Sequence, residues 1–147
     1  MSQCLRIAVA DDEPDMRDYY RRILPRLGHR VVGVSATGAE LLDQCRECRP
    51  DLVITDVKMP DMDGIEAAIR LTRDQPTPVI VVSALHDPET IGRATAEPTV
   101  TYLAKPIRQA ELGPVITQAV RRFEQWQAGR KDGDGIVPTV SETRPAR

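Results

Sequence analysis

Five short runs of apolar and β-branched residues constrain the fold of this chain more than any other feature. Each run has the length and composition of a buried strand, and together they are LRIAVA at 5–10, RVVGVS at 30–35, DLVITD at 51–56, TPVIVVS at 77–83 and TVTYLA at 99–104. A segment with helical spacing of apolar residues follows each run, over residues 14–27, 38–48, 64–73, 88–96 and 109–128. The sequence therefore predicts five strands that alternate with five helices.

The strands are apolar almost without interruption, which indicates that both faces of the sheet are buried. Strands of this kind form parallel sheets covered by helices on both sides and joined by right-handed crossovers. The predicted fold class is therefore α/β, with a doubly wound, five-stranded parallel sheet. Ligands bind beyond the carboxyl ends of the strands in such sheets, so the residues that follow each strand are the candidates for chemistry.

Polar residues stand where four of the apolar runs stop. Asp11 and Asp12 follow the first run, Asp56 ends the third, Ser83 ends the fourth and Lys105 follows the fifth. In a parallel sheet these side chains converge at one edge, where three carboxylates repel one another and favour a bound cation. Carboxylate oxygens with room for water ligands suit Mg²⁺.

The same residues suit phosphoryl transfer, which depends mainly on positioning and on neutralising negative charge. Lys105 and the metal would neutralise the charge of the phosphoryl group, and Ser83 offers it a hydroxyl. Asp56 becomes the candidate covalent nucleophile.

These residues and their spacing resemble the signature of the CheY-like receiver domains of two-component response regulators. The matching elements are Asp11-Asp12, Asp56-x-x-Met59-Pro60-x-x-Asp63-Gly64, Ser83-Ala84 and Lys105-Pro106. The resemblance covers roughly residues 4–128. It implies a stand-alone receiver domain, placed at residues 1–128, with strand order 2-1-3-4-5. Residues 129–147 mix Gly, Pro and charged residues without periodicity, and we expect a disordered tail there.

The resemblance also implies a role for each matching residue. Asp56 would be the phosphoacceptor, Asp12 and Asp56 direct ligands of Mg²⁺, and Asp11 a water-mediated ligand, with Mn²⁺ as a possible substitute. Lys58 would contribute its backbone carbonyl to the metal. Ser83 and Lys105 would contact the phosphoryl group.

Two further features follow from the same resemblance. Tyr102 matches the aromatic position that changes rotamer on activation, and the Lys105–Pro106 bond would be cis. One segment departs from the pattern, because Pro98-Thr99-Val100-Thr101 stands where many receivers have a Gly-Ala pair. A shorter or differently placed fourth helix is the expected consequence.

Composition points to a protein partner. The net charge is −2 and charges of both signs are interleaved, so we expect no nucleic-acid partner. No apolar run is long enough to span a bilayer, and three cysteines fit a reducing compartment, so we expect a cytoplasmic protein. The implied partners are a histidine kinase or histidine phosphotransfer protein and a downstream protein target, with the chain itself a monomer or weak dimer.

Alternatives from other classes are weaker. An aspartyl-phosphate hydrolase would carry a second acid two residues after its nucleophile, where this chain has Lys58. We therefore expect a phospho-acceptor that catalyses only its own phosphorylation and slow dephosphorylation. Residues 112–125 resemble the segment that joins some receivers to an RNA-binding antiterminator domain, but an amphipathic helix packed on the sheet explains them as well. The sequence is compatible both with a final switch and with an intermediate carrier in a phosphorelay.

Two hypotheses concern the surroundings of the site. On the first helix, Met16, Tyr20, Leu24 and Leu27 have the spacing of a core stripe. Tyr19 and Ile23 are then expected to be partly exposed, as a docking surface for the kinase. Separately, Lys58 and Leu85 flank the predicted phosphoryl site and neither orients an attacking water, which favours a long-lived phosphoryl group.

Overall fold

The computed structural model describes residues 3–84 and 86–134. The strands are β1 (Arg6–Ala10), β2 (Arg30–Ser35), β3 (Leu52–Asp56), β4 (Val79–Ser83) and β5 (Val100–Ala104). The helices are α1 (Pro14–Arg26), α2 (Gly38–Cys48), α3 (Gly64–Asp74), α4 (Pro88–Thr95) and α5 (Gln109–Asp134). All strand pairs are parallel and the order is β2-β1-β3-β4-β5, which confirms the predicted fold class and strand order.

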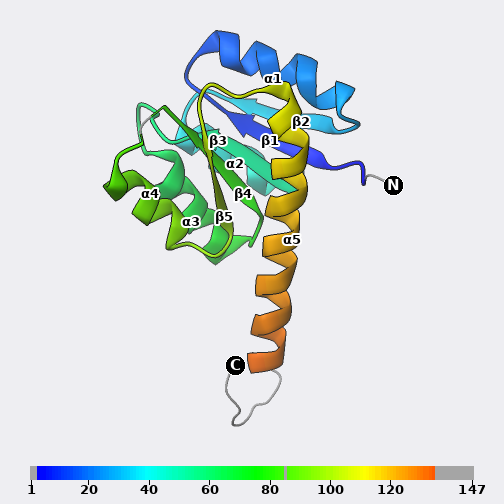
Figure 1. The fold of residues 1–147 in the computed structure, drawn as a ribbon, viewed down its shortest axis with the longest axis vertical. Coiled ribbons are helices and arrows are strands. Elements are labelled where there is room, and N and C mark those ends of the chain that lie inside the picture. The colour runs from blue at the N-terminus through cyan, green and yellow to red at the C-terminus, as the bar shows by residue number, and fades with distance from the viewer. Residues whose placement is uncertain (1–2, 85, 135–147) are drawn as a thin grey trace.

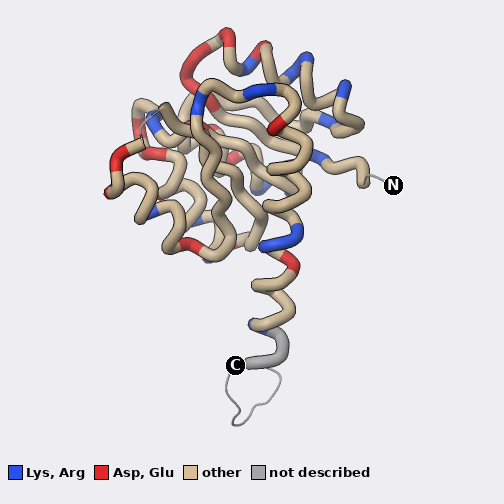
Figure 2. The backbone as a smooth tube through the Cα atoms, in the orientation of Figure 1, with Lys and Arg blue, Asp and Glu red and all other residues tan. Residues whose placement is uncertain are grey.

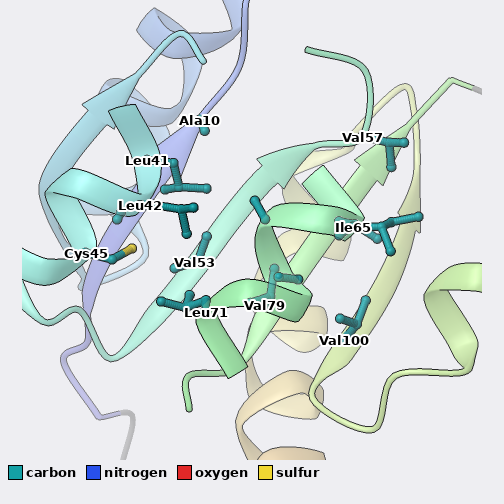
Figure 3. Packing of buried hydrophobic residues seen from close by; sticks show 14 of the residues in the cluster. Ala10, Leu41, Leu42, Cys45, Val53, Val57, Ile65, Leu71, Val79 and Val100 are labelled. Carbon is teal, nitrogen blue, oxygen red and sulfur yellow. The ribbon is translucent and has the colours of Figure 1, made fainter. Parts of the chain in front are cut away.

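Helices cover both faces of the sheet (Figure 1). Alternate residues of each strand face opposite sides of the sheet, so one strand contributes side chains to two hydrophobic cores, one on each face. In β1, Ala8 and Ala10 pack with residues of α2 and α3, whereas Ile7 and Val9 pack with residues of α1 and α5. Figure 3 shows the first of these cores. Burial on both faces explains why the strands are continuously apolar.

The strand pairing brings the carboxyl ends of the strands to one edge of the sheet. Ala10 is level with both Ser35 and Thr55, and Ser83 is level with Ala104. Hydrogen bonds continue one residue beyond the strands, because the amide of Asp11 donates to the carbonyl of Ser35 at 3.0 Å. The turns after the strands therefore start from a rigid edge.

On α1 the prediction for Ile23 is wrong. Its side chain is only 3% exposed and belongs to the core beside Tyr20 and Leu24, while Tyr19 is half-buried. The reason is geometric: an amphipathic helix buries a stripe at least ~100° wide. Ile23 lies within that stripe, three residues after Tyr20.

The last helix is longer than predicted. It continues to Asp134, six residues past the expected end at Ala128. A side-chain contact at helical spacing crosses the predicted end, because the Arg130 guanidinium lies 4.7 Å from the Trp126 ring centroid. The rest of the expected tail, residues 135–147, lies outside the described residues.

None of the helices in the described ranges is long and apolar enough to cross a membrane.

Helix α2 carries two cysteines three residues apart, Cys45 and Cys48. Cys45 is buried and Cys48 is half-buried, and both are free thiols. Burial raises the pKa of the Cys45 thiol to about 12, which opposes formation of a reactive thiolate.

Candidate functional site

Three carboxylates meet at the carboxyl edge of the sheet. Asp11 and Asp12 follow β1 and Asp56 ends β3, and each offers an oxygen within 4.8 Å of the other two. Asp11 is fully buried and Asp56 is 6% exposed, whereas Asp12 is exposed to solvent. The structure thus brings together the three acids that the sequence predicted, with one open side.

Lys105 provides the positive charge of this cluster. Its Nζ lies 3.3 Å from Oδ2 of Asp56 and 3.6 Å from Oδ2 of Asp11. The ammonium also lies 3.9 Å from Oε1 of Glu13, a neighbour that the sequence motifs do not indicate. One lysine does not balance the charge of this many carboxylates.

The donor set fits a small divalent cation. Oδ2 of Asp11 is buried and has no hydrogen bond, only the ion pair with Lys105. A buried carboxylate oxygen without a hydrogen bond is costly unless a charge compensates it. Oxygen ligands with one solvent-open side are what Mg²⁺ requires.

Burial dominates the acidity of the two inner acids. Desolvation raises the pKa of Asp11 above its ordinary value, even though the amide of Glu13 donates to its Oδ1 at 2.9 Å. Desolvation also raises the pKa of Asp56, against the opposing charge of Lys105 and a hydrogen bond from the Lys58 amide. Burial lowers the pKa of Lys105, but the summed attraction of Asp11, Asp56 and Glu13 raises it above its ordinary value.

A carboxyl group whose pKa is raised in the folded protein destabilises the fold when it ionises. The cost is absent below the ordinary pKa of 3.8 and present once the pH exceeds the folded-state value. We therefore expect Asp11→Asn, which keeps the acceptor for the Glu13 amide, to raise the free energy of unfolding at pH 7 in EDTA. Urea unfolding in EDTA and in Mg²⁺ measures this. An Asn variant less stable than the parent in EDTA would contradict the charge assignment.

The loop between β3 and α3 is anchored on both sides. Asp61 accepts hydrogen bonds of 2.8 Å from the amides of Gly38 and Ala39 at the start of α2. Asp63 caps α3 and pairs with Arg93 of α4 at 2.9 Å. These contacts fix the segment that follows the candidate phosphoacceptor.

The other predicted site residues also occupy the expected elements. Ser83 is buried at the end of β4, and its carbonyl accepts from the Lys105 amide at 2.9 Å. The Lys105–Pro106 bond is cis, as expected. Tyr102 is half-buried in β5, and its hydroxyl lies 3.4 Å from Nδ1 of His86. Leu85 lies outside the described residues.

A hollow of about 550 Å³ opens beside the acidic cluster. Its walls include Met16, Tyr19 and Arg22 of α1 and Pro106 and Ile107 after β5. Tyr19, one of the two residues predicted for docking, lines this hollow, whereas Ile23 is buried in the core.

Two positioning contacts were not predicted. Gly64 packs so closely on the main chain of Asp56 that a methyl group there would overlap the Asp56 carbonyl oxygen. Arg17 reaches from α1 to the turn of the acidic pair. The Asp63-Gly64 motif indicates that the glycine is important but not that it packs on the main chain of Asp56. No feature of the sequence indicates the contact of Arg17.

Comparison with known proteins identifies the family to which this fold and this site belong. The family profile described as the response regulator receiver domain matches residues 7–117. The chain belongs to this family, whose general function is phosphorelay signalling in two-component systems.

Individual relatives agree with that assignment. The transcriptional regulatory protein PdtaR of Mycobacterium tuberculosis is 34% identical over 142 residues, covering 97% of this chain and 67% of PdtaR. A protein-glutamate methylesterase/protein-glutamine glutaminase of Halobacterium salinarum is 41% identical over 67% of this chain, but the match covers only 29% of that enzyme. The chain therefore spans two thirds of one relative and less than one third of the other.

A solved structure also agrees with the assignment to the receiver family. The signal receiver domain of the response regulator NarL from Mycobacterium tuberculosis superposes with a TM-score of 0.73 at 26% identity, covering 82% of this chain and 98% of that domain.

Proposed function

We propose that this chain accepts a phosphoryl group on Asp56 in a Mg²⁺-dependent reaction and so switches its binding to a protein partner. One observation carries the proposal, namely the cluster of Asp11, Asp12 and Asp56 around Lys105 at the carboxyl edge of the sheet. It combines a nucleophile, a set of cation ligands and a fixed positive charge. These are the components that phosphoryl transfer requires.

Each residue has a distinct task in this proposal. An Asp56 carboxylate oxygen attacks phosphorus while the bond from phosphorus to the donor breaks, and the donor leaves with that electron pair. Mg²⁺ held by Asp11, Asp12, Asp56 and the Lys58 carbonyl would supply positive charge to the phosphoryl oxygens, and Mn²⁺ is a possible substitute. Lys105 would neutralise part of the negative charge on the same phosphoryl oxygens, and Ser83 would offer them a hydroxyl.

The proposal does not include a turnover enzyme. An aspartyl-phosphate hydrolase needs a general acid near the nucleophile, and the side chain two residues after Asp56 is the exposed Lys58. A lysine ammonium donates hydrogen bonds but does not accept them. We therefore propose slow self-dephosphorylation as the only further reaction.

The test of this function is labelling by a small phosphodonor. The parent chain with acetyl phosphate and Mg²⁺ is expected to gain one phosphoryl group by intact mass, and EDTA is expected to prevent it. Asp56→Asn should remove the label, whereas Asp74→Asn, which changes an exposed carboxylate at the end of α3, should retain it. Labelling of Asp56→Asn at the parent level would refute the proposal.

Receiver domains interact with histidine kinases and downstream targets. For this chain we propose that the histidine-bearing donor docks over the hollow beside the cluster, with Tyr19 as an apolar contact. The half-buried Tyr19 ring packs on Tyr20 at 5.9 Å between centroids, and the Arg22 guanidinium lies 5.8 Å from it. A partly exposed aromatic ring at the edge of a reactive cleft is typical of a protein contact.

Tyr19→Ala is expected to slow transfer from a phosphorylated histidine protein by about tenfold, the loss of roughly 1.4 kcal/mol of contact energy. Labelling by acetyl phosphate should stay at the parent rate, because the acidic cluster does not include Tyr19. Arg21→Ala, whose guanidinium pairs with Asp18 on exposed α1 surface, is the matched control. An equal loss of both reactions in Tyr19→Ala would place docking elsewhere.

A further inference from the structure

The turn that carries the acidic pair is held by a side chain outside the cluster. Arg17 is half-buried in the first turns of α1, and its Nη1 donates to the carbonyl oxygen of Asp11 at 2.8 Å. The same turn is also held by the amide of Glu13 on the Asp11 carboxylate, the amide of Asp11 on the Ser35 carbonyl, and the ion pairs with Lys105. The Glu13 carbonyl accepts from two amides of α1, so the far end of the turn is joined to the helix, whereas Arg17 is the side chain that holds the carbonyl of Asp11.

Asp12 depends on this turn for its position. Within the described residues its carboxylate makes no hydrogen bond or ion pair, and it is exposed to solvent, yet one of its oxygens lies within 4.8 Å of oxygens of Asp11 and Asp56. Like charges at that separation repel one another. The backbone of the turn must therefore hold Asp12 in a position that its own electrostatics oppose.

We infer that Arg17 is a positioning residue that fixes the backbone of the Asp11–Asp12 turn in the geometry that binds a divalent cation. The inference rests on the proposed Mg²⁺ site, and among the described residues the hydrogen bond of the Arg17 side chain is to the carbonyl of Asp11. Outer contacts of this kind pre-organise metal ligands, and their removal typically weakens metal affinity by about 10- to 100-fold.

Electrostatics alone predicts the opposite sign. A guanidinium near three carboxylates repels an incoming cation, so removing its charge should tighten Mg²⁺ binding. Loss of positioning should instead weaken binding. The direction of the change therefore separates a structural charge from a positioning residue.

The experiment is calorimetric titration of the full chain with Mg²⁺ alone, at fixed ionic strength. We expect Arg17→Ala to raise the Kd for Mg²⁺ about tenfold. Arg17→Lys keeps the charge but loses the planar fork of donors, and it should raise the Kd in the same direction. Arg21→Ala removes a positive charge one helical turn further along α1, where the guanidinium pairs with Asp18 at 2.9 Å, and the Kd of this variant for Mg²⁺ should stay within about twofold of the parent's.

Two results would overturn the inference. One is Mg²⁺ binding by both Arg17 variants that is as tight as in the parent, or tighter. The other is a parent chain that does not bind Mg²⁺, which would refute the proposed function before any variant is compared. Thermal unfolding of each variant identifies a loss of fold, and the milder Arg17→Lys decides the question if Arg17→Ala does not fold.

Discussion

Asp12→Ala is expected to weaken Mg²⁺ binding by about a hundredfold or more, since removal of a direct ligand should exceed the effect of removing an outer contact. The physical reason is that Asp12 is the exposed member of the carboxylate cluster, while the inner acids are partly compensated by Lys105. Without Asp12 a cation would have to bind to oxygens that the lysine already neutralises. Calorimetric titration with Mg²⁺ measures the affinity directly, and labelling by acetyl phosphate should fall in parallel.

The matched control is Asp15→Ala, which removes another exposed carboxylate, from the first turn of α1. Asp15 does not belong to the carboxylate cluster, so its removal tests the general effect of a negative charge near the site. We expect the Kd of this variant to change by no more than about twofold. Equal losses in the two variants would show that Asp12 acts through surface charge and is not a ligand.

Gly64→Ala is expected to destabilise the fold by about 3 kcal/mol, at the upper end of what overpacking costs. The added methyl group would overlap the main-chain oxygen of Asp56 and approach the side chain of Thr55. Backbone atoms on a buried central strand cannot move aside cheaply. Because the displaced atoms belong to the candidate phosphoacceptor, labelling by acetyl phosphate should also slow under conditions where the variant is folded.

Gly92 provides a control of opposite sign. It lies inside α4, and a methyl group there would meet nothing within 4 Å. Ala is a better helix former than Gly, so Gly92→Ala should stabilise the fold by about 0.5–1 kcal/mol. Urea unfolding of both variants makes the comparison, and a Gly64→Ala variant as stable as the parent would show that the loop relaxes around the methyl group.

The alternation of apolar runs with helical segments was enough to predict the fold. The central runs of this doubly wound sheet are buried on both faces, so strands such as 52–56 and 79–83 differ from helices in length and pattern. The same topology predicts that the ends of β1, β3 and β5 converge, and so the meeting of Asp11, Asp56 and Lys105 was also predictable.

Contacts that depend on tertiary packing were not predictable. The burial of Ile23 follows from the width of the buried stripe on α1, and the spacing of apolar residues in the sequence does not fix that width to within one residue. Helix α5 continues past Ala128, where the Arg130 guanidinium packs on the Trp126 ring one helical turn earlier, and the apolar spacing of the sequence does not indicate this contact. The bond from Arg17 to Asp11 joins a side chain to a carbonyl, and a carbonyl carries no sequence signal.

We propose that Asp56 is the residue that carries the phosphoryl group. Sodium borohydride reduces an aspartyl phosphate to homoserine, so treating the labelled chain and sequencing its peptides by tandem mass spectrometry identifies the modified position. We predict homoserine at position 56 alone, in the sample labelled with Mg²⁺ and not in the sample with EDTA. Homoserine at position 11 or 12, or a phosphoryl group that resists borohydride on a serine, threonine or histidine, would contradict the account.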